Sequence, residues 1–216
     1  MTISPARGSS SNWILVTGLL VLCLVPTAAG IYRLTQLASG VVTVENQRFF
    51  AAPLPIIVHV FCVAAFCILG AFQFVPSLRF RTPWHRMTGK FLVPLGLISA
   101  FTGLWMNQFN DLPASDGTIL YLERVVFGLL MFVSLVLGYL AIRKPNYPAH
   151  RAWMMRGYAI GLGAGTQVLT HLPWFILVGT TPSVFPRAIL MGSGWVINLA
   201  VAEWFIRRNS VMAVRV

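Results

Sequence analysis

The stretch that decides the fold is Ile119–Ile142, which reads ILYLERVVFGLLMFVSLVLGYLAI. After Arg124 it runs to Ile142 without another charged side chain. A helix needs about 20 mostly apolar residues to cross the hydrocarbon core of a bilayer. This stretch therefore predicts a membrane-spanning helix.

Five other stretches meet the same requirement, at residues 13–32, 55–75, 89–108, 153–178 and 184–206. Of the 216 residues, 57% are hydrophobic and 10% are charged, which is too little charge to cover a water-soluble surface. No period-two alternation recurs, so the pattern does not favour a transmembrane barrel. We expect an all-α membrane protein with six transmembrane helices in a single domain over residues 1–216. A second interpretation of the first stretch is a cleavable signal peptide, because Arg7 precedes it and small residues occupy 27–30.

The charges divide between the two ends of the predicted helices. With the N-terminus inside, the cytoplasmic segments hold 12 of the 16 basic residues and one acid, Glu203. The outer side holds four arginines and four acids: Arg33, Arg48, Arg124, Arg187, Glu45, Asp111, Asp116 and Glu123. This is the positive-inside pattern, so both termini are expected in the cytoplasm. It accounts for the net charge of +11 without nucleic acid, and anionic lipid headgroups are the expected partners.

Two basic loops repeat a short motif. Pro83–Arg86 reads PWHR, and Pro148–Arg151 reads PAHR 65 residues later. This offset maps the second predicted helix onto the fourth and the third onto the fifth. Repeats of the same topology are related by an axis along the membrane normal. We therefore expect a central four-helix bundle of helices two to five, with helices one and six peripheral.

The four histidines form one pair at each membrane face. His85 and His150 lie at the cytoplasmic starts of helices three and five, whereas His59 and His171 lie near the outer ends of helices two and five. Thr82 and Asn146 are the expected N-caps. A helix N-terminus disfavours imidazolium, and neutral imidazole is the form that ligates a metal.

Glycines and arginines surround the inner pair. Glycines follow His85 and His150 along one face of each helix, which fits either close helix packing or room for a flat cofactor. Arg86, Arg151 and Arg156 suit carboxylates such as haem propionates, but the same groups also describe an anion site.

Two stretches carry a resemblance to a known family. The first contains His59, Gly70–Phe74 and the His85-Arg86 pair, and the second is His150–Ala159, which reads HRAWMMRGYA. They resemble a bacterial membrane family known only as domain of unknown function 2306. This resemblance implies the bacterial inner membrane and no established activity. More loosely, the pattern is similar to two-haem transmembrane cytochromes b, which implies an inner haem between helices three and five. Helix four offers Arg124 where that pattern requires a histidine.

We therefore predict a haem-b-binding electron-transfer protein with His85 and His150 as axial ligands and His59 and His171 as a weaker second site. The redox partner is unspecified, and no hydrolase or transferase motif is present. The alternative is a non-redox membrane protein that binds lipid headgroups or another anion at its cytoplasmic His-Arg motifs.

Overall fold

The computed structural model describes residues 9–76, 78 and 83–214, with the side chains of 9–12 and 209–214 left out of the description. Every regular element in these residues is helical. The elements are α1 (Ser9–Ser39), α2 (Gln47–Ala51), α3 (Pro53–Ala71), the 3-10 turn η1 (Phe72–Phe74), α5 (Trp84–Phe109), α6 (Gly117–Arg143), α7 (Tyr147–Gly161), α8 (Gly163–Val178) and α9 (Val184–Val214). The protein is thus the expected all-α membrane protein.

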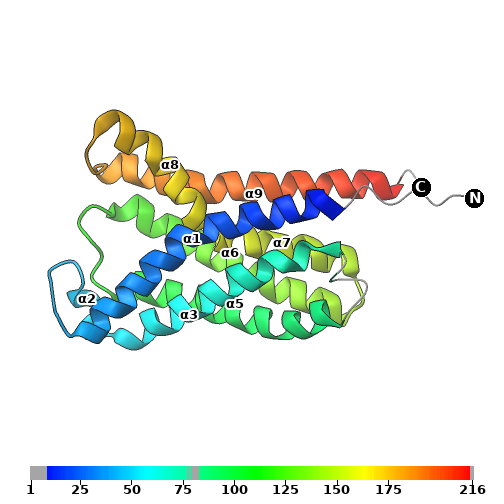
Figure 1. Ribbon diagram of the computed structural model, residues 1–216, viewed down its shortest axis with the longest axis horizontal. Helices are drawn as coiled ribbons and strands as arrows, with labels where there is room; N and C mark the ends of the chain where they lie inside the picture. Colours follow the sequence, from blue (N-terminus) through cyan, green and yellow to red (C-terminus); the bar gives the residue numbers. More distant parts are fainter. Residues whose placement is uncertain (1–8, 77, 79–82, 215–216) are drawn as a thin grey trace, which may run out of the picture.

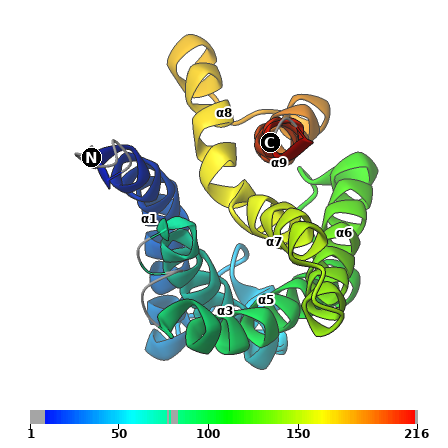
Figure 2. The ribbon, with the colours of Figure 1, turned by 90° about the vertical axis from the view of Figure 1, so that its right-hand side faces the viewer.

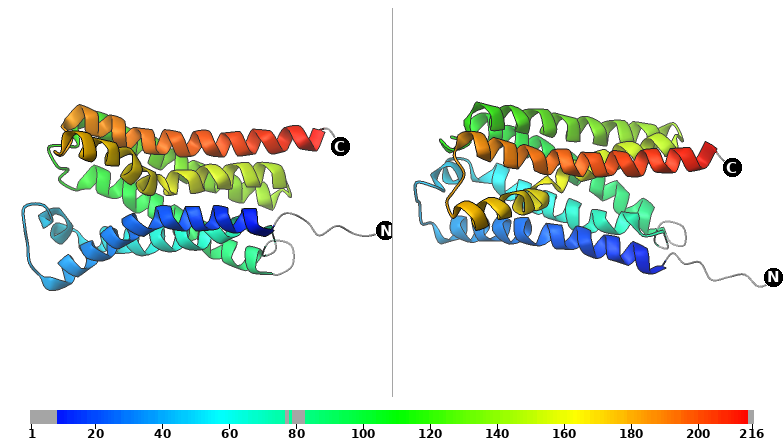
Figure 3. Two further views of the ribbon diagram at one scale, coloured as in Figure 1. Left: turned by 45° about the horizontal axis from the view of Figure 1, so that its top comes forward. Right: turned by 90° about the horizontal axis from the view of Figure 1, so that it is seen from above.

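Within the described residues, five helices are long and apolar enough to cross a membrane: Trp13–Ser39, Pro53–Phe74, Trp84–Phe109, Gly117–Arg143 and Val184–Arg208. They match five of the six expected stretches. The start of α1, the end of α9, and the turn between α6 and α7 lie at the same end of the molecule (Figures 1 and 3). We call this end, which carries Arg86, Lys90, Arg143, Lys144 and Arg151, the basic end.

Two helix pairs form most of the bundle. α3 packs against α5 and α6 packs against α7, and α5 joins the two pairs by packing against α6. These pairs correspond to the two halves of the predicted repeat. α1 lies on α3 and α8, and α9 lies on α6, α7 and α8 (Figure 2). The main core is formed by α1, α3, α5, α6 and α7, with side chains of α9 packed against it, and it includes Val16 of α1, Phe66 of α3 and Leu135 of α6.

The stretch 153–178 is not one continuous helix, because the chain turns at Leu162 between α7 and α8, and the expected count of six spans is not confirmed. Glycines on both sides of the break let three different neighbours approach. A Cβ at Gly161 would meet Phe66 of α3, at Gly163 Trp195 of α9, and at Gly165 the backbone of Leu22 in α1. The chain thereby leaves the bundle of α3, α5 and α6 and runs between α1 and α9 (Figure 2).

Side chains satisfy the carbonyl groups that this break exposes. The Asn198 amide donates to the Ala159 carbonyl at 3.0 Å, and the Cys67 thiol donates to the Gly161 carbonyl at 3.4 Å. Inside a bilayer, each unsatisfied backbone group costs several kcal/mol, so a helix break needs such replacements. The break is therefore a built feature of the fold.

Deeper in the bundle, the glycine faces that follow the inner histidines are filled by packing. A Cβ at Gly96 of α5 would lie 2.7 Å from both Leu135 and Phe66, and one at Gly157 of α7 would lie 2.8 Å from Leu135. On α3, the ring of Tyr158 occupies the space beside Gly70, and its hydroxyl donates to the Cys67 carbonyl at 2.7 Å. At these positions close helix packing accounts for the glycines.

Candidate functional site at the basic end

α7 begins at the turn that follows α6, and its first residues are fixed by local hydrogen bonds. Asn146 is the N-cap, as expected, and its side-chain oxygen accepts from the Ala149 N–H at 3.1 Å. The Nδ1 atom of His150 lies 2.8 Å from the Gly138 carbonyl of α6. His150 is half-buried, and this bond turns its ring towards α6.

α5 begins at the equivalent point of the other helix pair. Its N-cap position is Pro83, one residue later than expected, and Thr82 lies outside the described residues. His85 is half-buried and Arg86 is exposed. Both inner histidines thus lie in the first turn of their helices at the basic end, as predicted. α5 and α7 share only a small contact, and each of the two packs mainly against other helices.

The three arginines of the predicted site divide into two groups. Arg86 and Arg151 are exposed at the basic end. Arg156 lies deeper in α7 and instead pairs with Glu203 of α9, through Nε at 2.5 Å and Nη2 at 3.1 Å. Its guanidinium also lies 4.6 Å from the centre of the Trp153 ring. Arg156 therefore joins α7 to α9, a role that its sequence position did not indicate.

A groove of about 390 Å³ lies beside the turn between α6 and α7. Its walls include Leu137, Leu140 and Ala141 of α6 together with Trp153 of α7, and Lys144 and Asn146 complete its lining. Lys144 is exposed, and the exposed side chains of Arg143 and Arg151 lie close in sequence on the same two helices. The groove combines an apolar wall with one lining cation, Lys144. The basic residues are evident from the sequence, whereas the groove is not.

The outer histidines do not meet as a pair. His59 of α3 faces α5, with Nδ1 3.0 Å from the Ser99 carbonyl and 3.1 Å from the Thr102 hydroxyl. His171 lies on α8, and its Nδ1 is 2.7 Å from the Gln167 carbonyl of its own helix. The Nε2 atom of His171 is buried and has no hydrogen-bond partner among the described residues. Arg124, which the repeat places opposite His59, binds Asp116 instead.

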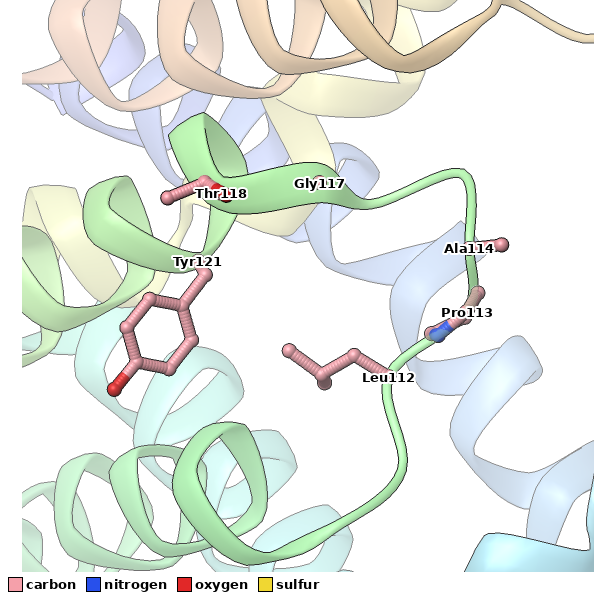
Figure 4. A pocket seen from close by; sticks show the side chains of 6 residues that line it. All are labelled: Leu112, Pro113, Ala114, Gly117, Thr118 and Tyr121. Atoms are coloured by element: carbon pink, nitrogen blue, oxygen red, sulfur yellow. The ribbon is translucent and has the colours of Figure 1, made fainter.

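At the end opposite the basic end, a pocket of about 330 Å³ is enclosed by the loop before α6 and its first turns. Figure 4 shows that the Leu112 side chain points from the loop towards Tyr121, and Gly117 and Thr118 are among the lining residues. None of its lining side chains is charged or an imidazole. The pocket therefore offers little to fix an ion. Within the described part of the chain, no group of three or more histidine, cysteine, aspartate or glutamate side chains is arranged to hold a metal.

Comparison with known proteins defines the class to which this arrangement belongs. The profile of a family described as "Predicted membrane protein (DUF2306)" matches residues 56–206, which include α5 to α8 and nearly all of α3. The chain belongs to this family. No curated protein and no solved structure matches the chain.

Proposed function

We propose that this protein holds an anionic phospholipid in the groove between the end of α6 and the start of α7. The observation that carries the proposal is the composition of the groove: an apolar wall of Leu137, Leu140 and Ala141 continues to Lys144. Acyl chains match such a wall, and a phosphate matches a lysine beside a helix N-terminus. Trp153 suits the boundary between the two chemistries.

The proposal includes an orientation in the bacterial inner membrane, with the basic end in the cytoplasm. The support is the positive-inside distribution of the charges. Cys23, Cys62 and Cys67 are buried, so an introduced cysteine can be labelled against a low background. In intact cells an impermeant maleimide should label Val44→Cys, whose side chain is exposed at the opposite end, but not Tyr147→Cys. Labelling of Tyr147→Cys alone would invert the orientation.

The lipid site is tested by native mass spectrometry of the full-length protein titrated with phosphatidylglycerol or phosphatidylcholine. A basic residue near an anionic surface contributes about 1 kcal/mol, which is about fivefold in a dissociation constant. Lys144→Gln should weaken the first phosphatidylglycerol site by about this factor. The matched control is Lys90→Gln, which removes an exposed lysine at the same end but outside the groove. Equal effects of both substitutions, or none of either, would contradict a specific site.

The second candidate function is electron transfer by haem b held between His85 and His150. One observation favours it: the bond between His150 Nδ1 and the Gly138 carbonyl is the kind that orients a metal-ligating histidine and leaves Nε2 for iron. The glycine faces deeper in the bundle weigh against it, because Leu135 and Phe66 fill them. A porphyrin would need space nearer the basic end. Bound haem b would supply one-electron chemistry.

A reduced-minus-oxidised absorbance spectrum of protein expressed with a haem supply decides this candidate. Haem ligation predicts a Soret and an α-band that are lost in His85→Ala and in His150→Ala. Lys90→Gln is the control, because it removes an exposed side chain of α5 at the same end of the molecule. Absence of these bands and of a pyridine haemochrome from the wild type would exclude haem b.

A further inference from the structure

Four basic residues of the described chain lie at the end opposite the basic end. Arg33 comes from α1, Arg48 from α2, Arg124 from α6 and Arg187 from α9. Two of them bind Asp116, which is 2% exposed and immediately precedes α6, and the other two stack on Phe49. Residues far apart in the sequence are therefore brought to one place by the packing of the helices.

Asp116 is fully occupied by two of these arginines. Arg124 donates through Nη1 to one carboxylate oxygen at 2.7 Å, and Arg187 donates through Nε to the other at 2.8 Å. Burial raises the pKa of Asp116, but the charges and hydrogen bonds of Arg124 and Arg187 outweigh burial and hold it below its ordinary value. This ion triad connects α6 to α9 and needs no further cation.

The other two arginines stack on one aromatic ring. The guanidinium of Arg33 lies 4.7 Å, and that of Arg48 4.6 Å, from the centre of the Phe49 ring. Arg33 also donates to Gln36 at 2.6 Å. By contrast, the Nε atom of Arg48 is buried and has no hydrogen-bond acceptor among the described residues. A buried donor without an acceptor is costly, and a specific one in a native fold requires an explanation.

Charge is not balanced around Arg48. Burial lowers its pKa, Asp116 raises it, and the charges of Arg33, Arg124 and Arg187 lower it again, so all of these groups lie within electrostatic reach. Glu123 lies beside Arg124 on α6 and against Gly192 of α9. Around Arg48, the three other arginines outnumber Asp116, which leaves an excess of positive charge.

We propose that this arginine cluster binds a phosphate-type oxyanion, which Arg48 contacts through its buried Nε. The guanidinium fork matches the geometry of phosphate oxygens, and the excess of positive charge around Arg48 favours an anion. The cluster is reachable, because the side chains of Arg124 and Arg187 are 24% and 29% exposed. The phosphate can come from a lipid headgroup of that leaflet or from a free phosphate ester. The site shares no residue with the groove at the basic end.

The test has two arms on the full-length protein in detergent. The first titrates inorganic phosphate against chloride at constant ionic strength and measures binding by calorimetry. The second measures retention of phosphatidylglycerol by native mass spectrometry. Arg48→Gln should weaken binding at least about tenfold, as expected for loss of a charge-assisted hydrogen bond. The matched control is Arg208→Gln, an exposed arginine 5.2 Å above the Trp204 ring at the basic end.

Arg48→Lys separates charge from the guanidinium fork, and it keeps the test decisive if Arg48→Gln fails to fold. The expected order of affinity is arginine, then lysine, then glutamine at position 48. Dependence on Arg48 in the phosphate arm identifies a free anion, and dependence in the lipid arm alone identifies a headgroup. Equal binding by the position-48 variants and wild type in both arms, or no binding by the wild type in either, would overturn the proposal.

Discussion

Alanine at Gly96 should destabilise the protein, whereas alanine at Gly89 should not. At position 96 the new Cβ would lie 2.7 Å from Leu135 Cδ1 and 2.7 Å from Phe66 Cε2. Leu135 is 0% exposed and Phe66 is 4% exposed, so neither side chain has free space to enter. Extra volume in a well-packed core costs about 1–3 kcal/mol.

Position 89 is the matched control on the same face of α5, about two turns earlier. No heavy atom lies within 4 Å of a Cβ built there. Alanine should therefore gain only helix propensity, which favours it over glycine by about 1 kcal/mol. Because both substitutions gain the same helix propensity, the free energies of unfolding of the two variants should differ by the overpacking cost of about 1–3 kcal/mol.

The assay is reversible denaturation in mixed detergent micelles, followed by circular dichroism and tryptophan fluorescence. Gly96→Ala should unfold at lower denaturant than the wild type, and Gly89→Ala at the same or higher denaturant. If Gly96→Ala is as stable as Gly89→Ala, the contact among α3, α5 and α6 is looser than described. The glycine face would then have room for a flat ligand, and helix packing would no longer weigh against bound haem.

Three further outcomes are expected from the same unfolding assay. Asn146→Ala removes the acceptor for the Ala149 N–H and should cost about 1 kcal/mol, so an unchanged midpoint would contradict the cap. The ion pairs of Asp116 lower its pKa from the ordinary value of 3.8 despite the opposing effect of burial. They should therefore stabilise the folded protein fully above pH 3.8, and this stabilisation should be lost as the pH falls below the lowered pKa. Asp116→Asn should remove this acid dependence, and identical pH profiles would refute the assignment. Arg156→Gln and Glu203→Gln should show a coupling of up to about 1 kcal/mol in a double-mutant cycle, because the ion pair is partly exposed. Additive effects of the two substitutions on the free energy of unfolding would exclude the ion pair.

Most of the helices could be predicted from the sequence because lipid imposes a simple requirement of length and apolarity. The expected starts and ends fall close to those of α3, α5 and α6. The break at Leu162 could not be predicted in the same way. Glycines at 161, 163 and 165 indicate close approach of a neighbour, but they do not reveal that α3, α9 and α1 approach from different directions. That information lies in the tertiary packing.

The candidate sites show the same division. The Asn146 cap depends on neighbouring residues and was predicted correctly. The ion pairs depend on distant ones: Arg156 and Glu203 are 47 residues apart, and Arg187 and Asp116 are 71 apart. Glu203 also pairs with Arg207, four residues later on the same helix, at a longer distance of 3.8 Å. Pairing within a helix can be inferred from spacing, whereas pairing between helices requires the fold.

Photocrosslinking tests the proposed lipid site most directly. Phosphatidylglycerol with a diazirine on its acyl chain would be activated on the reconstituted full-length protein, and the adducts would be mapped by peptide mass spectrometry. The groove predicts adducts concentrated at Leu137, Leu140 and Ala141, reduced in Lys144→Gln and absent with the phosphatidylcholine analogue. Adducts spread evenly over the exposed helix faces, or the same pattern with both lipids, would contradict a phospholipid site between α6 and α7.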